Sequence, residues 1–288
     1  MVSVVRRCVS FIPLALVAGV LAGCAGGKQS IEPRPGEVKG LTPAEADARA
    51  AAVRHDPAAY LHQVAAKCGA LEQYTLKFER YERLGLLQTL RGPEHMQCWF
   101  RRQPFSVRME WLDADVKYGQ SVYVAGQAGD KVRFVTRRWS PPLLPPPSVN
   151  KVDLQAPVVW GESQRPLTDF GLERMMERTL DSYRRAGERV VLTYQGLCLL
   201  PDSERTVHHI HLEYPETYYR VPVQELYVDV VTDLPAGTVL KTRSGEIDAA
   251  YFYADVNPNV KLTDDDFVLD AERSAGEKQP GKTAPGKK

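Results

Sequence analysis

The chain has 288 residues, of which 43% are hydrophobic and 25% are charged, and its formal net charge is +1. This length and hydrophobic content are sufficient for a well-packed core, in one large domain rather than several small ones. Acidic and basic residues are nearly equal in number and are mixed along the chain, which argues against a nucleic-acid partner.

The first 23 residues have the pattern of a signal peptide. Arg6 and Arg7 precede a largely apolar run, residues 9–21, which is followed by two small residues. The run has about 13 residues, whereas a membrane-spanning helix needs roughly 20. Residues 21–24 (Leu-Ala-Gly-Cys) resemble the lipobox of bacterial lipoproteins. This resemblance implies cleavage before Cys24 and lipid attachment to that cysteine.

Several acyl chains on Cys24 would hold the protein at a membrane without a transmembrane helix. We therefore expect a lipid-anchored protein of the bacterial cell envelope that faces the periplasm. Ala25 and Gly26 lack the aspartate that retains enterobacterial lipoproteins at the inner membrane, which mildly favours the outer membrane. The alternative is an ordinary secretory signal with a chance cysteine.

The two ends of the mature chain differ in composition from its middle. Residues 24–41 are rich in Gly, Pro and charge and are expected to form a flexible tether. Residues 271–288 are rich in Lys, Gly and Pro and are expected to be a disordered tail. Residues 42–270 form the predicted folded domain.

Three cysteines lie in this domain: Cys68, Cys98 and Cys198. The periplasm permits disulfides, so one pair can form, and the sequence does not say which. Three buried free thiols, packed as small apolar residues, are the slightly favoured alternative.

Two helices are predicted at the start of the domain. Thr42-Pro43-Ala44-Glu45 has the pattern of a capping box with proline at the first helical position. Asp56-Pro57 is a second start, and the following apolar residues are spaced three and four apart as far as Cys68. Gly69 is expected to end this second helix.

Alternating apolar and polar residues follow, which indicates half-buried strands. The predicted strands are residues 73–79, 96–100, 105–111, 121–125, 132–136, 190–194, 206–214, 225–230, 238–242 and 247–256. The prolines among residues 141–147 predict an extended excursion, and a helix follows Asp169 with an apolar stripe from Leu172 to Tyr183. About ten strands exceed what a flat sheet holds. We therefore expect an α+β fold, a strongly curved antiparallel sheet (an unclosed β-barrel) with helices in its concave side.

Short motifs in the last third of the chain resemble the end of a LolA-like domain. They are Val228-Asp229, residues 232–235 (Thr-Asp-Leu-Pro), residues 251–255 (Tyr-Phe-Tyr-Ala-Asp), Asn259 and residues 262–267. That superfamily includes the lipoprotein carrier LolA, its acceptor LolB and the regulator RseB. The resemblance implies an unclosed barrel that wraps helices around an apolar cavity. Because this chain has its own lipobox, it is more similar to an anchored acceptor or sensor than to a soluble shuttle.

A second resemblance is narrower. Residues 74–111, with Lys77-Phe78-Glu79-Arg80 and the run from Pro104 to Trp111, are similar to the uncharacterised bacterial family called domain of unknown function 1571. The two resemblances together cover residues 55–268. Their motifs are turn and core residues, so they imply a fold and not an activity.

The first hypothesis for function is a binding protein without catalysis or cofactor. Its ligand would be a lipid, an acyl chain or a lipidated protein, held in the apolar cavity between helices and sheet. Flexible methionine side chains can repack around such a ligand. The candidate ligand-binding residues are Phe78, Phe100, Met109, Trp111, Met175, Met176, Leu226 and Val228. Most apolar stripes are plain core, and that reading stays open for each of them.

Two alternatives remain at this point. The first is a structural or regulatory module with a filled core that binds another envelope protein. The second, weaker alternative is a metal-dependent hydrolase, because His209, His211 and Glu213 share one face of a predicted strand. A zinc site normally has three or four protein ligands, so this trio is a minimal set. The chain has none of the usual serine, zinc-protease or phosphate-binding motifs, and no catalytic residue is assigned.

Overall fold

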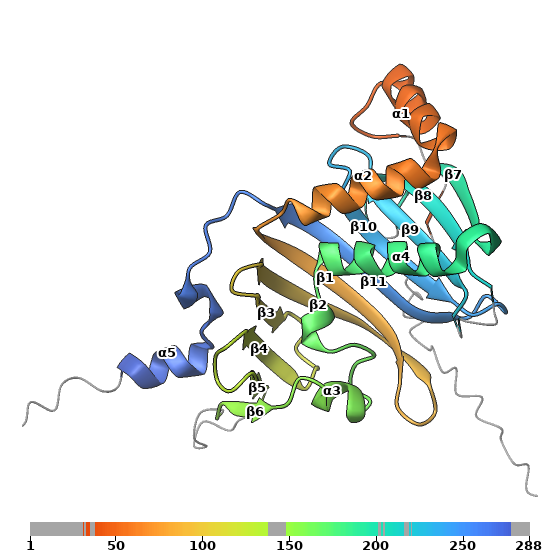
Figure 1. The fold of residues 1–288 in the computed structure, drawn as a ribbon. Coiled ribbons are helices and arrows are strands. Elements are labelled where there is room, and N and C mark those ends of the chain that lie inside the picture. The colour runs from red at the N-terminus through yellow and green to blue at the C-terminus, as the bar shows by residue number, and fades with distance from the viewer. Residues whose placement is uncertain are drawn as a thin grey trace, which may run out of the picture.

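The computed structural model describes residues 31, 33–34, 38–137, 148–200, 203, 205–215, 219 and 221–277. The signal peptide, Cys24 and the proline-rich residues 141–147 lie outside the described residues, and what the sequence indicates for them stays a prediction. The described chain forms one 11-stranded sheet, in the order β6-β5-β4-β3-β2-β1-β11-β10-β9-β8-β7 (Figure 1).

The elements have the following bounds. The strands are β1 Gln73–Leu84, β2 Thr89–Arg101, β3 Ser106–Trp111, β4 Tyr118–Val124, β5 Val132–Thr136, β6 Asn150–Val152, β7 Val191–Leu199, β8 Thr206–Glu213, β9 Val223–Asp229, β10 Pro235–Lys241 and β11 Ile247–Asn257. The helices are α1 Pro43–His55, α2 Pro57–Gly69, α3 Ala156–Val159, α4 Leu172–Ala186 and α5 Asp270–Glu277, with 3-10 turns at Leu167–Asp169, Gly187–Arg189 and Asp264–Phe267.

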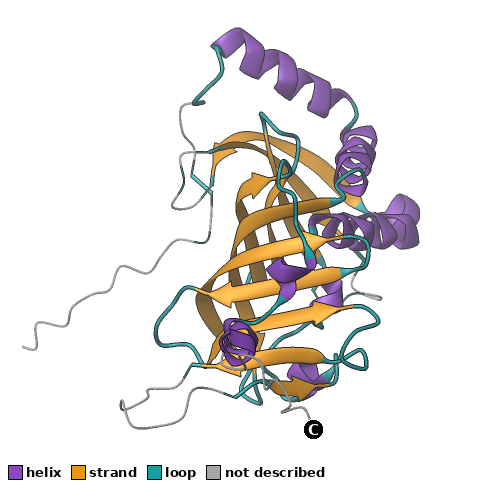
Figure 2. Ribbon diagram, turned by 90° about the vertical axis from the view of Figure 1, so that its left-hand side faces the viewer, coloured by secondary structure: helices purple, strands orange, loops and turns teal. Residues whose placement is uncertain are grey.

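The sheet is antiparallel, curved and open. β1 pairs with β2 on one side and with β11 on the other, so the first and last strands are neighbours near its middle. β6 and β7 end the strand order, and therefore the barrel does not close. Figure 2 shows the strong curvature from the side. The predicted fold class is confirmed.

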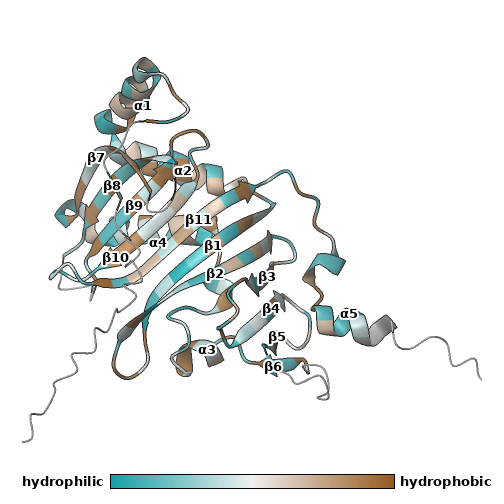
Figure 3. Ribbon diagram, turned by 180° about the vertical axis from the view of Figure 1, so that it is seen from behind, coloured by the Kyte–Doolittle hydropathy of each residue, from teal (hydrophilic) through white to brown (hydrophobic). Residues whose placement is uncertain are grey.

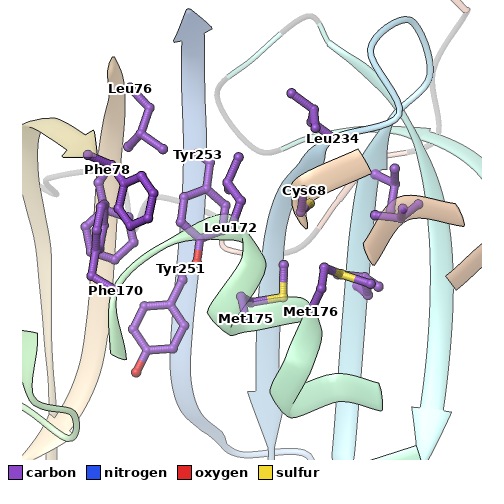
Figure 4. Packing of buried hydrophobic residues seen from close by; sticks show 14 of the residues in the cluster. Cys68, Leu76, Phe78, Phe170, Leu172, Met175, Met176, Leu234, Tyr251 and Tyr253 are labelled. Carbon is purple, nitrogen blue, oxygen red and sulfur yellow. The ribbon is translucent and has the colours of Figure 1, made fainter. Parts of the chain in front are cut away.

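Helices α2 and α4 cover the concave face (Figure 1). From α2, Leu61, Val64 and Cys68 are at most 1% exposed. From α4, Met175 and Met176 are at most 3% exposed and point toward the sheet (Figure 4). These side chains join the inward residues of the strands in one apolar cluster. Each buried side chain of this size contributes about 1.5–3 kcal/mol to folding, so this cluster is the main stabilising contact of the domain.

Both predicted helix starts are confirmed by their caps. The Thr42 hydroxyl accepts from the Glu45 N–H at 3.3 Å, and the Glu45 carboxylate accepts from the Thr42 N–H at 2.9 Å. At the second helix, the Asp56 carboxylate accepts from the Ala59 N–H at 2.8 Å. These side chains satisfy amide groups that have no partner within their own helix.

The structure has one strand more than the ten expected. β6 is three residues long and has no fully buried side chain, so it carries no alternation that the sequence could reveal. The four-residue helix α3 also has no buried residue, and it was not predicted for the same reason.

Parts of the two predicted end segments contact the folded domain. α5 continues to Glu277, and Glu272 holds this segment by pairing with Arg133 and by accepting from the Leu269 N–H at 3.0 Å. At the other end, the backbone of Arg34 pairs with that of Leu199 at the edge of β7. These parts of the two segments are therefore docked on the sheet.

Cys68, Cys98 and Cys198 are free thiols. Burial raises the pKa of Cys68 and of Cys198 to about 12, and it raises the pKa of Cys98 well above its usual value. The three thiols are therefore inert packing residues under ordinary conditions.

His208 gives the fold a dependence on pH. Its side chain faces the concave side, is 1% exposed, and its Nδ1 lies 2.9 Å from the Tyr194 hydroxyl. Burial lowers the pKa of His208 to about 4. Between that value and about 6.5 the unfolded chain binds a proton that the folded chain does not. Acidification through this range therefore destabilises the fold.

We expect the free energy of unfolding to fall by about 2 kcal/mol between neutral pH and about pH 5 because of this residue. The variant His208→Gln keeps a hydrogen-bonding group but does not titrate, so its loss should be smaller by that amount. Urea unfolding of both proteins at the two pH values measures the difference. Equal losses in both proteins would contradict this assignment.

Candidate functional site

Three adjacent pockets lie between the concave face of the sheet and residues 156–182. The α4 pocket has a volume of about 330 Å³ and lies under α4, against β9, β10 and β11. The central pocket has about 60 Å³, and the α3 pocket, against β3, β4 and β5, has about 80 Å³. Arg165 lines all three. They form one series along the concave face, which is the candidate site.

Residues 156–170, which we call the cover segment, lie over the central and α3 pockets. Polar contacts hold this segment to the sheet. The Gln164 N–H donates to Glu82 Oε2 at 3.1 Å, and Arg80 donates to the Ser163 hydroxyl at 3.1 Å. Glu162 accepts from Lys117 and from Tyr118. Only Phe170, at the end of the segment, is fully buried, so most of the cover segment is attached without burying apolar side chains.

The charges around the central and α4 pockets are balanced. Arg80 pairs with Glu94 at 2.6 Å. Arg165 and Arg178 lie 3.8 and 3.6 Å from the same carboxylate, Asp169. Burial lowers the pKa of Arg178, and the nearby positive charge of Arg165 lowers it further. Asp248 and Glu82 offset the remaining charge, so these pockets do not select strongly for an anion.

One polar atom at the site has no partner. Arg165 Nε is buried and has no hydrogen-bond acceptor among the described residues. A buried donor without an acceptor costs about 1–3 kcal/mol, so an acceptor at this position would be stabilising. Arg165 therefore offers a hydrogen bond to the polar end of a bound molecule.

The α3 pocket is the most apolar of the three. Met109, Trp111, Val132, Phe134 and Trp160 line it. The Trp111 indole N–H donates to Glu94 at 3.0 Å, which holds the ring with its apolar part against the pocket. The pocket therefore combines aromatic walls with one flexible methionine, a lining that suits a hydrocarbon chain.

The eight residues proposed as ligand-binding fall into two groups. Phe78, Met109, Trp111 and Met175 each line at least one of the three pockets. Phe100, Met176, Leu226 and Val228 are at most 3% exposed, belong to the central apolar cluster and line none of these pockets. Figure 4 shows Met175 and Met176 side by side on α4, although only Met175 reaches the α4 pocket.

Sequence reasoning missed the cover segment. Trp160, Gln164 and Arg165 lie between predicted elements, in a stretch without periodicity. Gln164, for example, contacts Glu82 and Asp248, which are 82 and 84 positions away in the chain. The only local feature that distinguishes them is a tryptophan and an arginine within a short polar loop.

Residues 71–274, more than half of the chain, match the profile of the family described as "Protein of unknown function (DUF1571)". The chain belongs to this family. The resemblance of residues 74–111 to this family, noted in the sequence, is therefore confirmed. Among curated proteins, none matches the sequence.

Three solved structures illustrate the wider similarity of the DUF1571 fold. MucB in its complex with MucA, from Pseudomonas aeruginosa, is 16% identical with a TM-score of 0.40, and the match covers 75% of this chain and 62% of that one. A LolA superfamily protein from Nitrosomonas europaea is 9% identical (TM-score 0.33; 74% and 97% covered). The lipoprotein LppX of Mycobacterium tuberculosis is 12% identical (TM-score 0.42; 72% and 100% covered). The chain thus spans less than two thirds of MucB, and likenesses this distant carry no argument about function.

The histidine cluster of the DUF1571 protein is not arranged as the sequence suggested. Glu225 on β9 lies 2.8 Å from His209 Nε2 and 3.1 Å from His211 Nδ1, whereas Glu213 pairs with Arg243. Burial alone would raise the pKa of Glu225, but the hydrogen bonds and charges of the two histidines outweigh burial and lower it.

The trio with Glu213 is therefore wrong as a ligand set. In the part of the chain that the structure describes, no three His, Cys, Asp or Glu side chains are grouped so as to hold a metal ion. The same part of the chain has no helix that is both long and apolar enough to cross a membrane.

Glu82 is the main attachment point of the cover segment. It is 2% exposed and accepts from the Tyr251 hydroxyl at 2.7 Å as well as from the Gln164 amide. In Glu82→Ala these two donors lose their acceptor and Arg80 loses one of its carboxylates. We expect a fall of about 3 kcal/mol in the free energy of unfolding, and faster hydrogen exchange in residues 156–170.

Glu79→Ala is the matched control, because Glu79 lies on the same strand with its carboxylate partly exposed on the opposite face of the sheet. It should change the free energy of unfolding by less than about 1 kcal/mol. Urea unfolding and hydrogen exchange of both variants test the assignment. Equal exchange rates in residues 156–170 of the two variants would show that Glu82 does not hold the cover segment.

Proposed function

We propose that this protein is a cell-envelope lipoprotein, anchored through Cys24, that binds a hydrophobic ligand on the concave face of its sheet without catalysis. The observation that carries the proposal is an apolar pocket beneath a segment held by polar contacts. The ligand class is a lipid, an acyl chain or the acyl group of a lipidated protein. Facing the periplasm from the outer membrane is the preferred location.

The contrast between α4 and the cover segment supports this proposal. α4 packs through Met176 and Leu172, which are fully buried, so its removal would expose much of the core. In the cover segment, Pro157, Trp160 and Leu167 line the α3 pocket and none of them is fully buried. Its polar contacts can be exchanged for water at little net cost. A hydrocarbon chain can therefore displace the part of the cover segment around Trp160 from the α3 pocket, while Arg165 and the core stay in place.

The residues that line the three pockets predict the orientation of the ligand. Its hydrocarbon part would lie against Met109, Trp111 and Phe134, and its polar end would reach the unpartnered Nε of Arg165. The charges near Arg165 are balanced, so a neutral polar group such as an ester carbonyl serves as well as an anion. In this arrangement the apolar side chains and the Arg165 Nε only hold the ligand, which agrees with a non-catalytic role.

The runner-up is a structural or regulatory module that binds another envelope protein. The tight packing of Phe100, Met176, Leu226 and Val228 favours it, because the centre of the concave face is filled. In that case the three pockets would be ordinary packing gaps around polar side chains.

A fatty-acyl binding experiment separates the two functions. Phe134 lines the α3 pocket and is only partly buried, so Phe134→Glu places a charge in the proposed site with limited damage to the core. We expect this variant to bind a dansyl-labelled fatty acid at least about tenfold more weakly than the wild type. Titration of the probe fluorescence measures the effect.

Phe105→Glu is the control, because Phe105 is also a partly buried aromatic residue and lines none of the three pockets. It should leave probe affinity within about twofold of the wild type. Mass spectrometry of the protein purified from its own membranes should also detect a co-purified lipid. A wild-type protein that carries no lipid and takes up no probe would contradict the proposal and favour the runner-up.

A further inference from the structure

Four large apolar side chains are exposed at one end of the molecule. Leu86 and Leu87, in the turn between β1 and β2, are 99% and 87% exposed. Val159 and Trp160, at the end of α3, are 79% and 54% exposed. We call these four residues the apolar tip. Figure 3 shows the hydrophobic colour at the β1–β2 turn and at α3.

The two parts of the apolar tip are adjacent in space. A Cβ atom placed on Gly161 would lie 3.5 Å from the backbone nitrogen of Gly85, so the turn and the end of α3 are in contact. The other large apolar residues exposed in the described chain, Leu112, Val191 and Val231, are single positions on other elements. A contiguous exposed apolar group of this kind indicates an interaction surface.

The shape of the apolar tip favours a lipid surface as its occupant. Leu86 and Leu87 project from a tight turn and line none of the pockets described above, so the tip is a protrusion and not a groove for a partner's side chain. Exposed leucines in a turn, with a half-exposed tryptophan beside them, are typical of segments that enter the headgroup region of a bilayer.

The charge beside the tip is positive. Arg83 donates to the carbonyl oxygens of Ile247 at 2.6 Å and of Gln88 at 3.1 Å, which fixes its guanidinium beside the turn. Arg91 is exposed next to Gly85. Within the described ranges neither arginine forms an ion pair with a carboxylate. Unpaired arginines near the surface of a bilayer attract anionic lipids.

The position of Ile31 allows the tip and the proposed lipid anchor to reach one bilayer. Ile31 lies on the outer face of the sheet, in a pocket with Tyr81 and Phe252, and it belongs to the outer cluster that also includes Leu90 at the start of β2. Six residues lie between Cys24 and Ile31, and the seven Cα–Cα steps from one to the other span at most about 25 Å. An anchor at Cys24 therefore does not hold this end of the sheet away from the membrane.

We propose that the apolar tip inserts into the headgroup region of an anionic lipid bilayer, as a second membrane contact besides the acyl chains on Cys24. Leu86, Leu87 and Val159 enter the apolar boundary, while Arg83 and Arg91 meet lipid phosphates. Because Trp160 belongs both to the tip and to the α3 pocket, docking places that pocket next to the bilayer. The membrane contact does not depend on the ligand and is tested without it.

The test uses the mature chain, residues 24–288, with Cys24→Ala, which removes the acyl chains and keeps every residue that the structure describes. Vesicles of phosphatidylethanolamine and phosphatidylglycerol are floated through a sucrose gradient with this protein. We expect the double variant Leu86→Asp and Leu87→Asp to bind at least about tenfold more weakly than the parent. Both side chains are almost fully exposed, so the variant should fold as the parent does.

The matched control is Val191→Asp with Val231→Asp, which changes two exposed apolar residues on other elements. It should float as the parent does. Vesicles of phosphatidylcholine should bind the parent more weakly, because they carry no net charge for the arginines. The proposal is overturned if the tip variant floats like the parent, if the control loses binding equally, or if the parent dimerises through the tip in sedimentation without vesicles.

Discussion

The pairing of β1 with β11 is the constraint on which the remaining structure depends. It brings the two ends of the folded domain together in the middle of the sheet, with the strands before α4 on one side and those after it on the other. Phe78 on β1 then lies beside Tyr253 on β11, and Phe170 packs on its ring (Figure 4). The concave face is therefore continuous across the two halves, and α2 and α4 are packed over one common core.

Two kinds of contact cover that face. Apolar side chains fix α2 and α4, and their loss would expose the core to water. The cover segment is fixed through Glu82, Arg80 and Glu162, whose contacts are polar. Local opening is cheapest where little apolar area is buried. The helices α2 and α4 are therefore held firmly, whereas the cover segment separates more easily from the sheet. The apolar α3 pocket lies under the cover segment.

The sequence was sufficient for most of the architecture. Thr42, Asp56 and the spacing of residues on α2 predict helices because capping and packing are local interactions. Strand alternation predicts the sheet for a similar reason. Residues without periodicity were missed, as in β6 and α3, where no side chain is fully buried. α5 was missed because an ion pair, Arg133 with Glu272, fixes a segment whose composition resembles a disordered tail.

The site was harder to predict than the fold. Met109, Trp111, Phe100 and Val228 all satisfy the same alternation, and only the three-dimensional packing separates pocket-lining residues from core. Likewise, the register of β8 against β9 decides that His211 faces Glu225. Such pairings depend on contacts between distant segments, which a single sequence does not display.

The position of β1 also bears on the export that we propose for this chain. Its partner β11 ends at Asn257, more than 170 residues later, so half of its hydrogen bonds must wait until nearly the whole domain is available. Pairing across this separation is slow compared with local pairing. During the export that we propose, such a chain would keep its sheet incomplete, which is the state that a narrow channel accepts, and would complete the sheet only after its last strand arrives.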